Sequence, residues 1–227
     1  MGLGQKDRGA EISAQAEEYL EAVCRVLDRG ALATPTELAH ELGVAPPSVL
    51  GMLKRLEDQG FATYSRQTGA VLTESGAFHA GALRRRHRLA ERLLTDLLGM
   101  PWERAHPIAC RFEHVIDDEV EEYLLAALHN PTTCPHGNPL EATGGEPWRP
   151  LSTLEIGQTG QLRCIIDESV STLQYLTHIR LTPGTRVVVR ARAPEQGPLT
   201  VEVENERFAL SPLMAAALMV EVEAEAA

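Results

Sequence analysis

Glycine and proline divide the first 75 residues into short segments, and the positions of these residues restrict the fold more than any other feature of the chain. Between these residues the apolar side chains recur at the three- and four-residue spacing of amphipathic helices. Thr34 suits an N-cap before Pro35, and Gly60 closes the last of these helices. The segments expected to be helical are 14–28, 34–42 and 46–59.

The second and third of these helices are separated only by a short turn at Gly43-Val44, which is the helix-turn-helix pattern. Two short β-prone runs, 61–65 and 70–73, follow on either side of a turn that ends at Gly69. Such runs around a glycine turn predict a β-hairpin. A hairpin directly after the third helix is a wing, so residues 1–75 are predicted to form a winged-helix DNA-binding domain.

The helix at 46–59 would be the one that reads DNA, because the second helix of this motif enters the major groove. Its first half, including Met52, offers small or apolar side chains without Arg, Asn or Gln, which favours thymine methyl contacts and shape readout. The alternative is that its basic residues belong to the solvated face of an ordinary bundle. The predicted DNA-contacting residues are Pro47, Ser48, Gly51, Lys54, Arg55 and Arg66.

Charge is distributed unevenly along the chain. The net charge is −11, but residues 44–100 hold eight Lys or Arg against five acidic residues, whereas residues 101–227 hold nine against nineteen. DNA affinity depends on local basic surface more than on the total. The acidic total therefore does not exclude double-stranded operator DNA as a partner.

Beyond residue 75 the expected secondary structure changes twice. Helices are expected at 75–99, from about 101 to 114 and at 117–128, followed by an irregular linker rich in Pro and Gly at 130–150. From residue 153 onward short β-prone runs predict a small barrel: 161–166, 186–190 and 199–203. The predicted fold is mainly α with a β C-terminal part, in three domains: 1–75, 76–150 and 151–227.

Other properties of the chain limit its location and its cysteine chemistry. No stretch resembles ~20 unbroken apolar residues, and the first residues lack the apolar run of a secretory signal. We therefore expect a cytoplasmic protein with no membrane partner. Its four cysteines form no CxxC pair, so each should be a thiol that either fills the core or binds metal.

Residues able to bind metal are concentrated in the middle of the chain. His87 and Glu91 are four residues apart on one predicted helix, and His106 and Cys110 have the same spacing on the next. Imidazole, carboxylate and thiolate together suit borderline divalent transition metals. Each pair alone would more often be a salt bridge or core filler, but six such residues lie within 28 positions: His87, Glu91, His106, Cys110, Glu113 and His114.

These stretches resemble the diphtheria toxin repressor and manganese transport regulator family of metal-dependent repressors. The resemblance spans about residues 14–224 and ends in a region similar to FeoA domains. It implies a winged-helix domain, a helical dimerisation and metal-binding domain, and a small β-barrel. The residues that carry it are Arg86–Leu94, Cys110–Val115, Asp118–Glu121, Cys134–Pro139, Ile179–Thr185 and Gly197–Leu199.

The resemblance also implies two sets of ligands and a further pair. Cys134 and His136 are secondary candidates, whose alternative role is to shape the linker turn. The primary set would be Glu18, Cys110, Glu113 and His114. The ancillary set would be His87, Glu91, His106 and Glu168.

The implied function is a homodimeric transcriptional regulator of metal homeostasis genes, activated by Mn²⁺ or Fe²⁺, and not an enzyme. Manganese is slightly favoured, because Glu18 offers a hard carboxylate, although the thiol of Cys110 is the ligand type of the iron-sensing members of the family. One alternative is a winged-helix regulator with a non-metal effector, which would leave the ligand cluster unexplained. A metallohydrolase would need a water, an open coordination position and a general base, and the sequence contains no HExxH motif.

Overall fold

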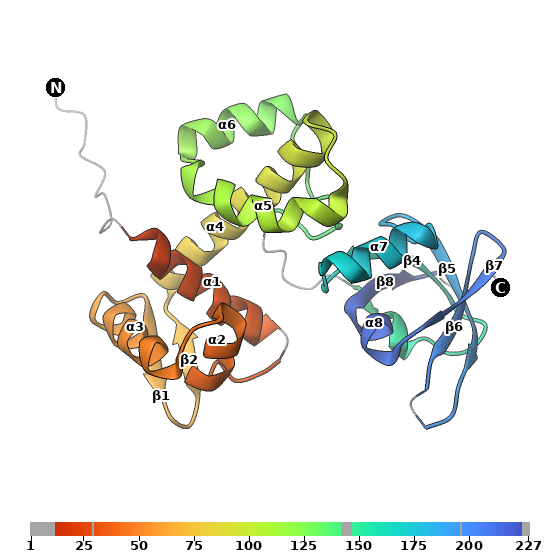
Figure 1. Cartoon of the computed structure of the whole chain (residues 1–227), viewed down its shortest axis with the longest axis horizontal. Coiled ribbons are helices and arrows are strands. Elements are labelled where there is room, and N and C mark those ends of the chain that lie inside the picture. Colours follow the sequence, from red (N-terminus) through yellow and green to blue (C-terminus); the bar gives the residue numbers. More distant parts are fainter. Residues whose placement is uncertain (1–11, 29, 142–146, 196, 224–227) are drawn as a thin grey trace. The chain divides into compact units, whose positions relative to one another are not determined.

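A computed structural model describes residues 12–28, 30–141, 147–195 and 197–223 (Figure 1). The chain divides between Arg84 and Arg85 into two compact units, which we describe separately. Among the helices of these described ranges, none is long and apolar enough to cross a membrane.

The N-terminal unit is a three-helix bundle with a β-hairpin, as predicted from the sequence. Thr34 caps the second helix by accepting a hydrogen bond from the Glu37 amide at 3.2 Å, and Gly43 ends it at a φ of 65°. The elements are α1 (Ala14–Asp28), α2 (Pro35–Leu42), α3 (Pro46–Asp58), β1 (Ala62–Ser65), β2 (Gly69–Leu72) and the start of α4 (Glu74–Arg92).

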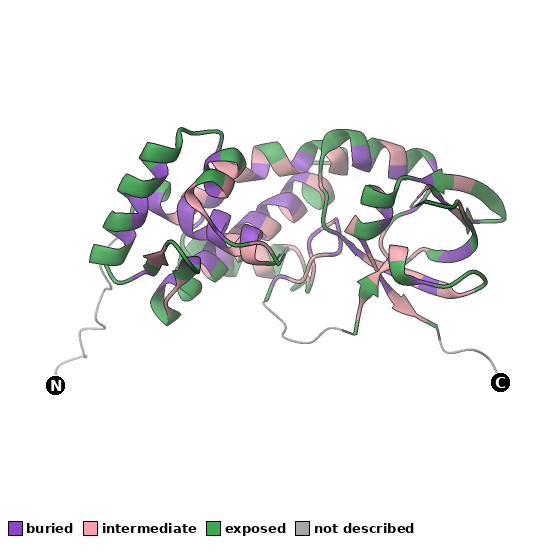
Figure 2. Ribbon diagram, turned by 90° about the horizontal axis from the view of Figure 1, so that it is seen from below, coloured by how far each residue is buried: buried purple, intermediate pink, exposed green. Residues whose placement is uncertain are grey.

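One face of each helix in this unit is buried, as expected for amphipathic segments (Figure 2). Leu20, Leu38, Val49 and Leu56 are fully buried in the core. The hairpin pairs Ala62 with Leu72 in antiparallel register. The bundle therefore holds α3 by its apolar side and leaves its other side exposed.

The C-terminal unit begins with a helical part whose elements are shorter than predicted. The expected helix 75–99 ends as an α-helix at Arg92 and continues as a π-helical turn, and the expected helix 101–114 is divided into three pieces. The helix at 117–128 is confirmed, with Asp117 as its N-cap. The elements are η1 (Leu93–Leu97), η2 (Trp102–Arg104), α5 (Ala105–Phe112), η3 (Glu113–Val115) and α6 (Asp118–Ala127).

The β part of this unit is a six-stranded sheet in the order β3-β8-β4-β5-β6-β7, with every neighbouring pair antiparallel. Its core contains Leu162, Leu173, Val189 and Leu218, which are fully buried. The three predicted strands are confirmed. The elements are β3 (Arg149–Pro150), η4 (Leu151–Thr153), β4 (Thr159–Ile165), α7 (Val170–His178), β5 (Arg186–Arg192), β6 (Leu199–Val203), β7 (Glu206–Leu210), α8 (Pro212–Ala217) and β8 (Leu218–Val222).

Candidate metal centre and DNA-reading surface

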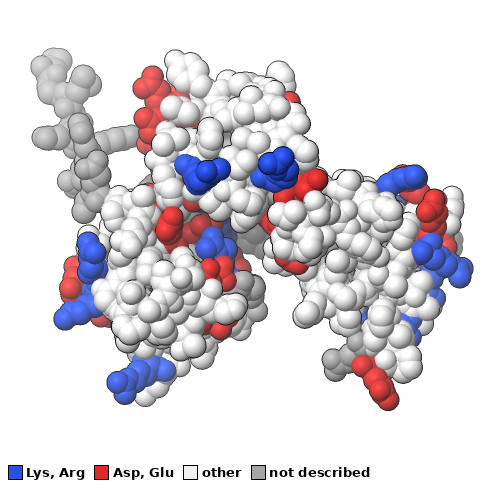
Figure 3. All heavy atoms as spheres, viewed as in Figure 1, with Lys and Arg blue, Asp and Glu red and all other residues white. Residues whose placement is uncertain are grey.

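The exposed side of α3 carries the residues predicted to contact DNA. Pro47, Ser48, Gly51, Lys54 and Arg55 are all exposed, as is Arg66 in the hairpin turn. In Figure 3 basic side chains are visible along the α3 edge of the N-terminal unit and at the hairpin tip, with acidic ones between them. Their contacts with DNA stay a prediction. Met52, which was expected on the same surface, is instead 6% exposed and belongs to the core.

Helix α4 supplies two buried ligands of the candidate metal centre. His87 and Glu91 lie one turn apart, and the His87 Nε2 atom is 3.2 Å from Glu91 Oε1. The same helix buries Leu89 and Ala90, and the turn η1 that follows it buries Leu94. This packing holds both polar side chains inside the unit, where His87 is 6% and Glu91 0% exposed.

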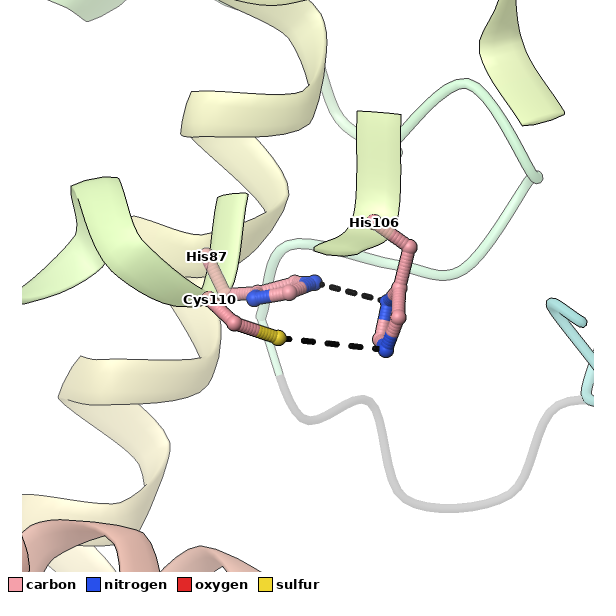
Figure 4. Close-up of side chains that lie close together, drawn as sticks. All are labelled: His87, His106 and Cys110. Atoms are coloured by element: carbon pink, nitrogen blue, oxygen red, sulfur yellow. Dashed lines mark hydrogen bonds between the residues drawn. The ribbon is translucent and has the colours of Figure 1, made fainter. Parts of the chain in front are cut away.

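Helix α5 brings His106 and Cys110 against the first pair (Figure 4). His106 Nδ1 lies 3.0 Å from His87 Nε2 and 3.3 Å from Glu91 Oε1. The Cys110 Sγ atom is 4.0 Å from His106 Nε2. Because the His106 side chain remains 36% exposed, an ion could reach the cluster from its side.

The loop between β4 and α7 contributes Glu168. Its Oε2 atom lies 2.8 Å from His106 Nδ1. Ligand atoms of all four predicted ancillary residues, His87, Glu91, His106 and Glu168, lie within 4.8 Å of one another. The structure therefore brings this set together, although its occupation by an ion stays a prediction.

The linker brings Cys134 and His136 to the same place. His136 Nδ1 is 3.4 Å from Glu91 Oε2, 3.5 Å from Glu168 Oε1 and 3.8 Å from Cys134 Sγ. These four residues form a second set of ligand atoms within 4.8 Å of one another. Cys134 also shapes the turn, because its carbonyl accepts a hydrogen bond from the Gly137 amide at 3.0 Å. Both roles suggested by the sequence are thus compatible with the fold.

The predicted primary set is only partly brought together. Glu113 is 2% exposed, and its Oε2 atom accepts a hydrogen bond from His87 Nδ1 at 2.5 Å, while its Oε1 atom is 3.5 Å from His114 Nε2. Glu113 and His114 lie in the 3-10 turn η3, which follows directly on α5, and their role as ligands stays a prediction. Glu18 lies on α1 in the N-terminal unit, and its role stays a prediction.

The pKa values within the cluster are set by contacts between its imidazoles, carboxylates and thiol. Burial alone would lower the pKa of His106, but hydrogen bonds with Cys110 and Glu168 outweigh it and raise the pKa to about 11. Burial would raise the pKa of the Cys110 thiol, yet His106 and His87 lower it to about 7. The pKa of Glu91 is lowered, because three imidazoles outweigh its burial. Divalent ions would displace the imidazole protons, so metal binding should release protons.

One buried oxygen of the cluster offers a further position for an ion. Glu91 Oε2 forms no hydrogen bond of normal geometry within the described residues, and its neighbour His136 Nδ1 lies 3.4 Å away. Buried polar atoms are nearly always hydrogen-bonded, and such an exception requires an explanation. An ion held by carboxylate, imidazole and thiolate would satisfy this oxygen.

Several residues around the centre were not singled out from the sequence. Asn138 donates a hydrogen bond to Glu168 Oε1 at 2.7 Å, and the Trp102 ring stacks on His136 with centroids 5.4 Å apart. Arg92 donates to the carbonyls of Thr133 and Cys134 at 2.7 and 3.2 Å. Asn138 belongs to the linker stretch that carries the family resemblance, so a signal for it was present.

Comparison with known proteins decides the family. Models of an iron-dependent repressor N-terminal DNA-binding domain, of an iron-dependent repressor metal-binding and dimerisation domain, and of a FeoA domain match residues 11–70, 73–141 and 149–222. The chain belongs to the iron-dependent repressor family. It is a metal-dependent, DNA-binding transcriptional repressor, and the fold class predicted from the sequence is confirmed.

Individual relatives cover nearly the whole chain. The iron-dependent repressor IdeR of Mycobacterium tuberculosis is 33% identical, over 93% of this chain and 98% of its own. The diphtheria toxin repressor of Corynebacterium glutamicum is 30% identical, over 90% and 95% respectively. A solved manganese-dependent transcriptional repressor in complex with manganese has a TM-score of 0.85 and 27% identity, over 92% of this chain and 100% of that chain. These relatives are repressors and not enzymes.

Proposed function

We propose that this repressor is a homodimer that binds double-stranded operator DNA when its buried cluster holds Mn²⁺ or Fe²⁺. The observation that carries the proposal is the set His87, Glu91, His106 and Glu168, whose ligand atoms converge within 4.8 Å around a carboxylate oxygen that lacks a hydrogen bond. A non-metal effector would leave this buried set unexplained. A repressor must reach the chromosome, so the cytoplasmic location predicted from the sequence agrees with this proposal.

The ion would act through differential affinity for one arrangement of the dimer. A ligand shifts an equilibrium only if it binds one state better than the other. In a twofold dimer the two α3 helices must match half-sites about one helical turn apart. Binding energy at the cluster would therefore stabilise the arrangement in which the exposed faces of α3 fit the operator. The genes controlled would be those of metal homeostasis, as in the family.

Manganese is slightly favoured as the physiological ion. Glu91 and Glu168 are hard oxygen ligands, which suit Mn²⁺, and a structural relative at 27% identity is described in complex with manganese. The thiols of Cys110 and Cys134 favour softer ions, and the relatives of higher identity are named iron-dependent. The ratio of the Mn²⁺ and Fe²⁺ concentrations that half-saturate operator binding, measured without oxygen, separates the two.

The test begins with DNA fragments selected from a random-sequence library by the full-length protein with Mn²⁺. Binding of a selected fragment is then titrated with metal by fluorescence anisotropy, with sedimentation to measure the size of the assembly. We expect binding that depends on metal and is reversed by a chelator. Glu91→Gln should raise the midpoint concentration at least tenfold, while His178→Gln, at an exposed position of α7, serves as the matched control. Equal DNA affinity with chelator and with metal would refute the proposal.

A further inference from the structure

Trp102 lies in η2 and contacts two segments that are distant from it in the sequence. Its indole Nε1 atom donates a hydrogen bond at 2.7 Å to Thr177 Oγ1, on helix α7 of the β part. Its ring stacks on the His136 ring of the linker, with centroids 5.4 Å apart, and its carbonyl accepts a hydrogen bond from His136 Nε2 at 3.1 Å. Trp102 therefore joins the helical part, the linker and the β part of the C-terminal unit.

The contact with α7 uses both properties of an indole, its N–H group and its apolar surface. A hydroxyl has one proton to donate, and Thr177 Oγ1 donates it to the Leu173 carbonyl at 2.9 Å. The oxygen is thereby oriented to accept a hydrogen bond from Trp102. The indole also packs against the buried core of the β part, which contains Leu173 and Leu176.

Helix α7 connects this contact with Glu168, which lies two residues before the helix begins. The loop around Glu168 is fixed to the first turn, because Thr172 Oγ1 donates to Asp167 at 2.7 Å and Ser169 accepts a hydrogen bond from the Thr172 amide at 3.4 Å. Thr177 lies in the last turn of the same helix. A helix is stiff over this length, so the position of Thr177 determines where Glu168 lies.

The helical part carries a matching pair of residues. The turn η2 runs directly into α5, and His106 lies in the first turn of that helix, four residues after Trp102. His106 Nδ1 is 2.8 Å from Glu168 Oε2. The same two segments are thus joined at two points, one at Trp102 and Thr177 and the other at His106 and Glu168. Two points of contact fix the orientation of α7 against α5, whereas a single contact would let α7 pivot.

We propose that Trp102 is a positioning residue, which holds α7 on the helical part and thereby sets Glu168 against His106 for metal binding. This inference rests on the proposed function and adds to it the residue that controls metal affinity from outside the ligand set. Trp102 binds no metal itself. It reduces the conformational freedom that Glu168 loses when an ion binds, and such preorganisation increases affinity. Partners that orient metal ligands in this way contribute about 10- to 100-fold to metal affinity.

The experiment measures the Mn²⁺ affinity of the full-length protein by equilibrium dialysis. Trp102→Phe keeps an aromatic ring but removes the N–H group, and Thr177→Val removes its acceptor with little change in volume. We expect each variant to bind Mn²⁺ about tenfold more weakly. The double variant should be no weaker than either single variant, because both changes remove the same hydrogen bond. Trp148→Phe, at the other tryptophan of the chain, is the matched control and should bind Mn²⁺ as the parent does.

Two readouts separate positioning from general stability. The loss of Mn²⁺ affinity caused by Trp102→Phe should disappear when Glu168→Ala is already present, because the contact acts through the Glu168 carboxylate. In the metal-free protein, Trp102→Phe should accelerate hydrogen exchange in α7 and in the loop before it, and leave exchange in β5 and β6 unchanged. Circular dichroism establishes that each variant folds.

The outcomes separate this inference from the proposed function. Parent-like Mn²⁺ affinity in both Trp102→Phe and Thr177→Val would overturn the positioning role and leave the proposed function standing. An equal loss of affinity from Trp102→Phe with and without the Glu168 side chain would also overturn it, because the effect would then not pass through Glu168. A parent protein that retains no Mn²⁺ on dialysis would refute the proposed function and this inference with it.

Discussion

Gly137 packs closely against strand β4, and Gly137→Ala tests how that packing supports the candidate metal centre. Its φ is +87°, and a Cβ atom there would lie 1.9 Å from the Arg163 carbonyl oxygen and 2.9 Å from its carbonyl carbon. Both are backbone atoms of β4 and cannot rotate away. An alanine can be accommodated only if the linker moves off the strand.

The energetic cost follows from what that movement breaks. A non-glycine residue at positive φ costs about 1–2 kcal/mol. The linker would also lose the hydrogen bond from the Ile165 amide to the His136 carbonyl, at 3.0 Å, and that from Asn138 Nδ2 to the Ile165 carbonyl, also 3.0 Å. Each contributes about 1 kcal/mol. We therefore expect a loss of about 3–4 kcal/mol in the free energy of unfolding, together with weaker Mn²⁺ binding, since His136 moves with the linker.

The assay can be confined to the relevant unit. Both tryptophans, Trp102 and Trp148, lie in the C-terminal unit, so their fluorescence during urea unfolding reports on that unit. Gly157→Ala is the matched control, because Gly157 has a φ of +94° but no atom within 4 Å of an added Cβ. It should lose only the ~1–2 kcal/mol of backbone strain and bind Mn²⁺ normally. Equal losses in the two variants would show that close packing against β4 does not matter.

Three further predictions concern DNA and metal. Neutralising the basic residues Lys54 and Arg55 of α3 and Arg66 of the hairpin should weaken binding to all DNA sequences. It should also lower the salt dependence of log K by about one unit per lost phosphate contact. Unchanged DNA affinity of the variant that lacks all three charges would remove these residues from the interface. Glu18→Met should shift the preference of operator binding from Mn²⁺ toward Fe²⁺; an unaltered ratio of midpoints would mean that Glu18 is not a ligand. His114→Ala should abolish metal-dependent operator binding, whereas His87→Ala should leave a weakened response to metal. Both proteins should still be dimeric on sedimentation. A normal midpoint metal concentration for His114→Ala would overturn the primary-site assignment.

Local sequence signals were sufficient for the N-terminal unit. Thr34 and Pro35 begin α2 as expected, and Gly69 starts β2 at a φ of 69°, where a Cβ atom would lie 2.9 Å from the Ala33 carbonyl oxygen. Each boundary there depends on residues within a few positions of it. The same kind of signal was present but unused for two helices of the β part, since Ser169 caps α7 and Ser211 caps α8.

The centre itself depends on contacts that spacing cannot supply. The i, i+4 pattern correctly pairs His87 with Glu91, but it gives no indication that Glu113, in the turn η3, contacts His87. Glu168 approaches His106 from 62 positions away, because tertiary packing brings the β4–α7 loop to α5. Only the family resemblance indicated Glu168, and no pattern in the sequence indicated that two carboxylates would be shared.

Helix α4 carries two i, i+4 pairs offset by a single residue, and this offset explains how an irregular linker is held beside the candidate ligands. His87 and Glu91 point into the ligand cluster, while Arg88 donates to the Pro139 carbonyl and Arg92 to the carbonyls of Thr133 and Cys134 in the linker. Because both pairs are fixed to one helix, the linker is held at a set distance from Glu91, and His136 is presented to Glu91 Oε2. Arg88 and Arg92 therefore hold the linker against α4, and the position of the candidate ligand His136 follows from these contacts.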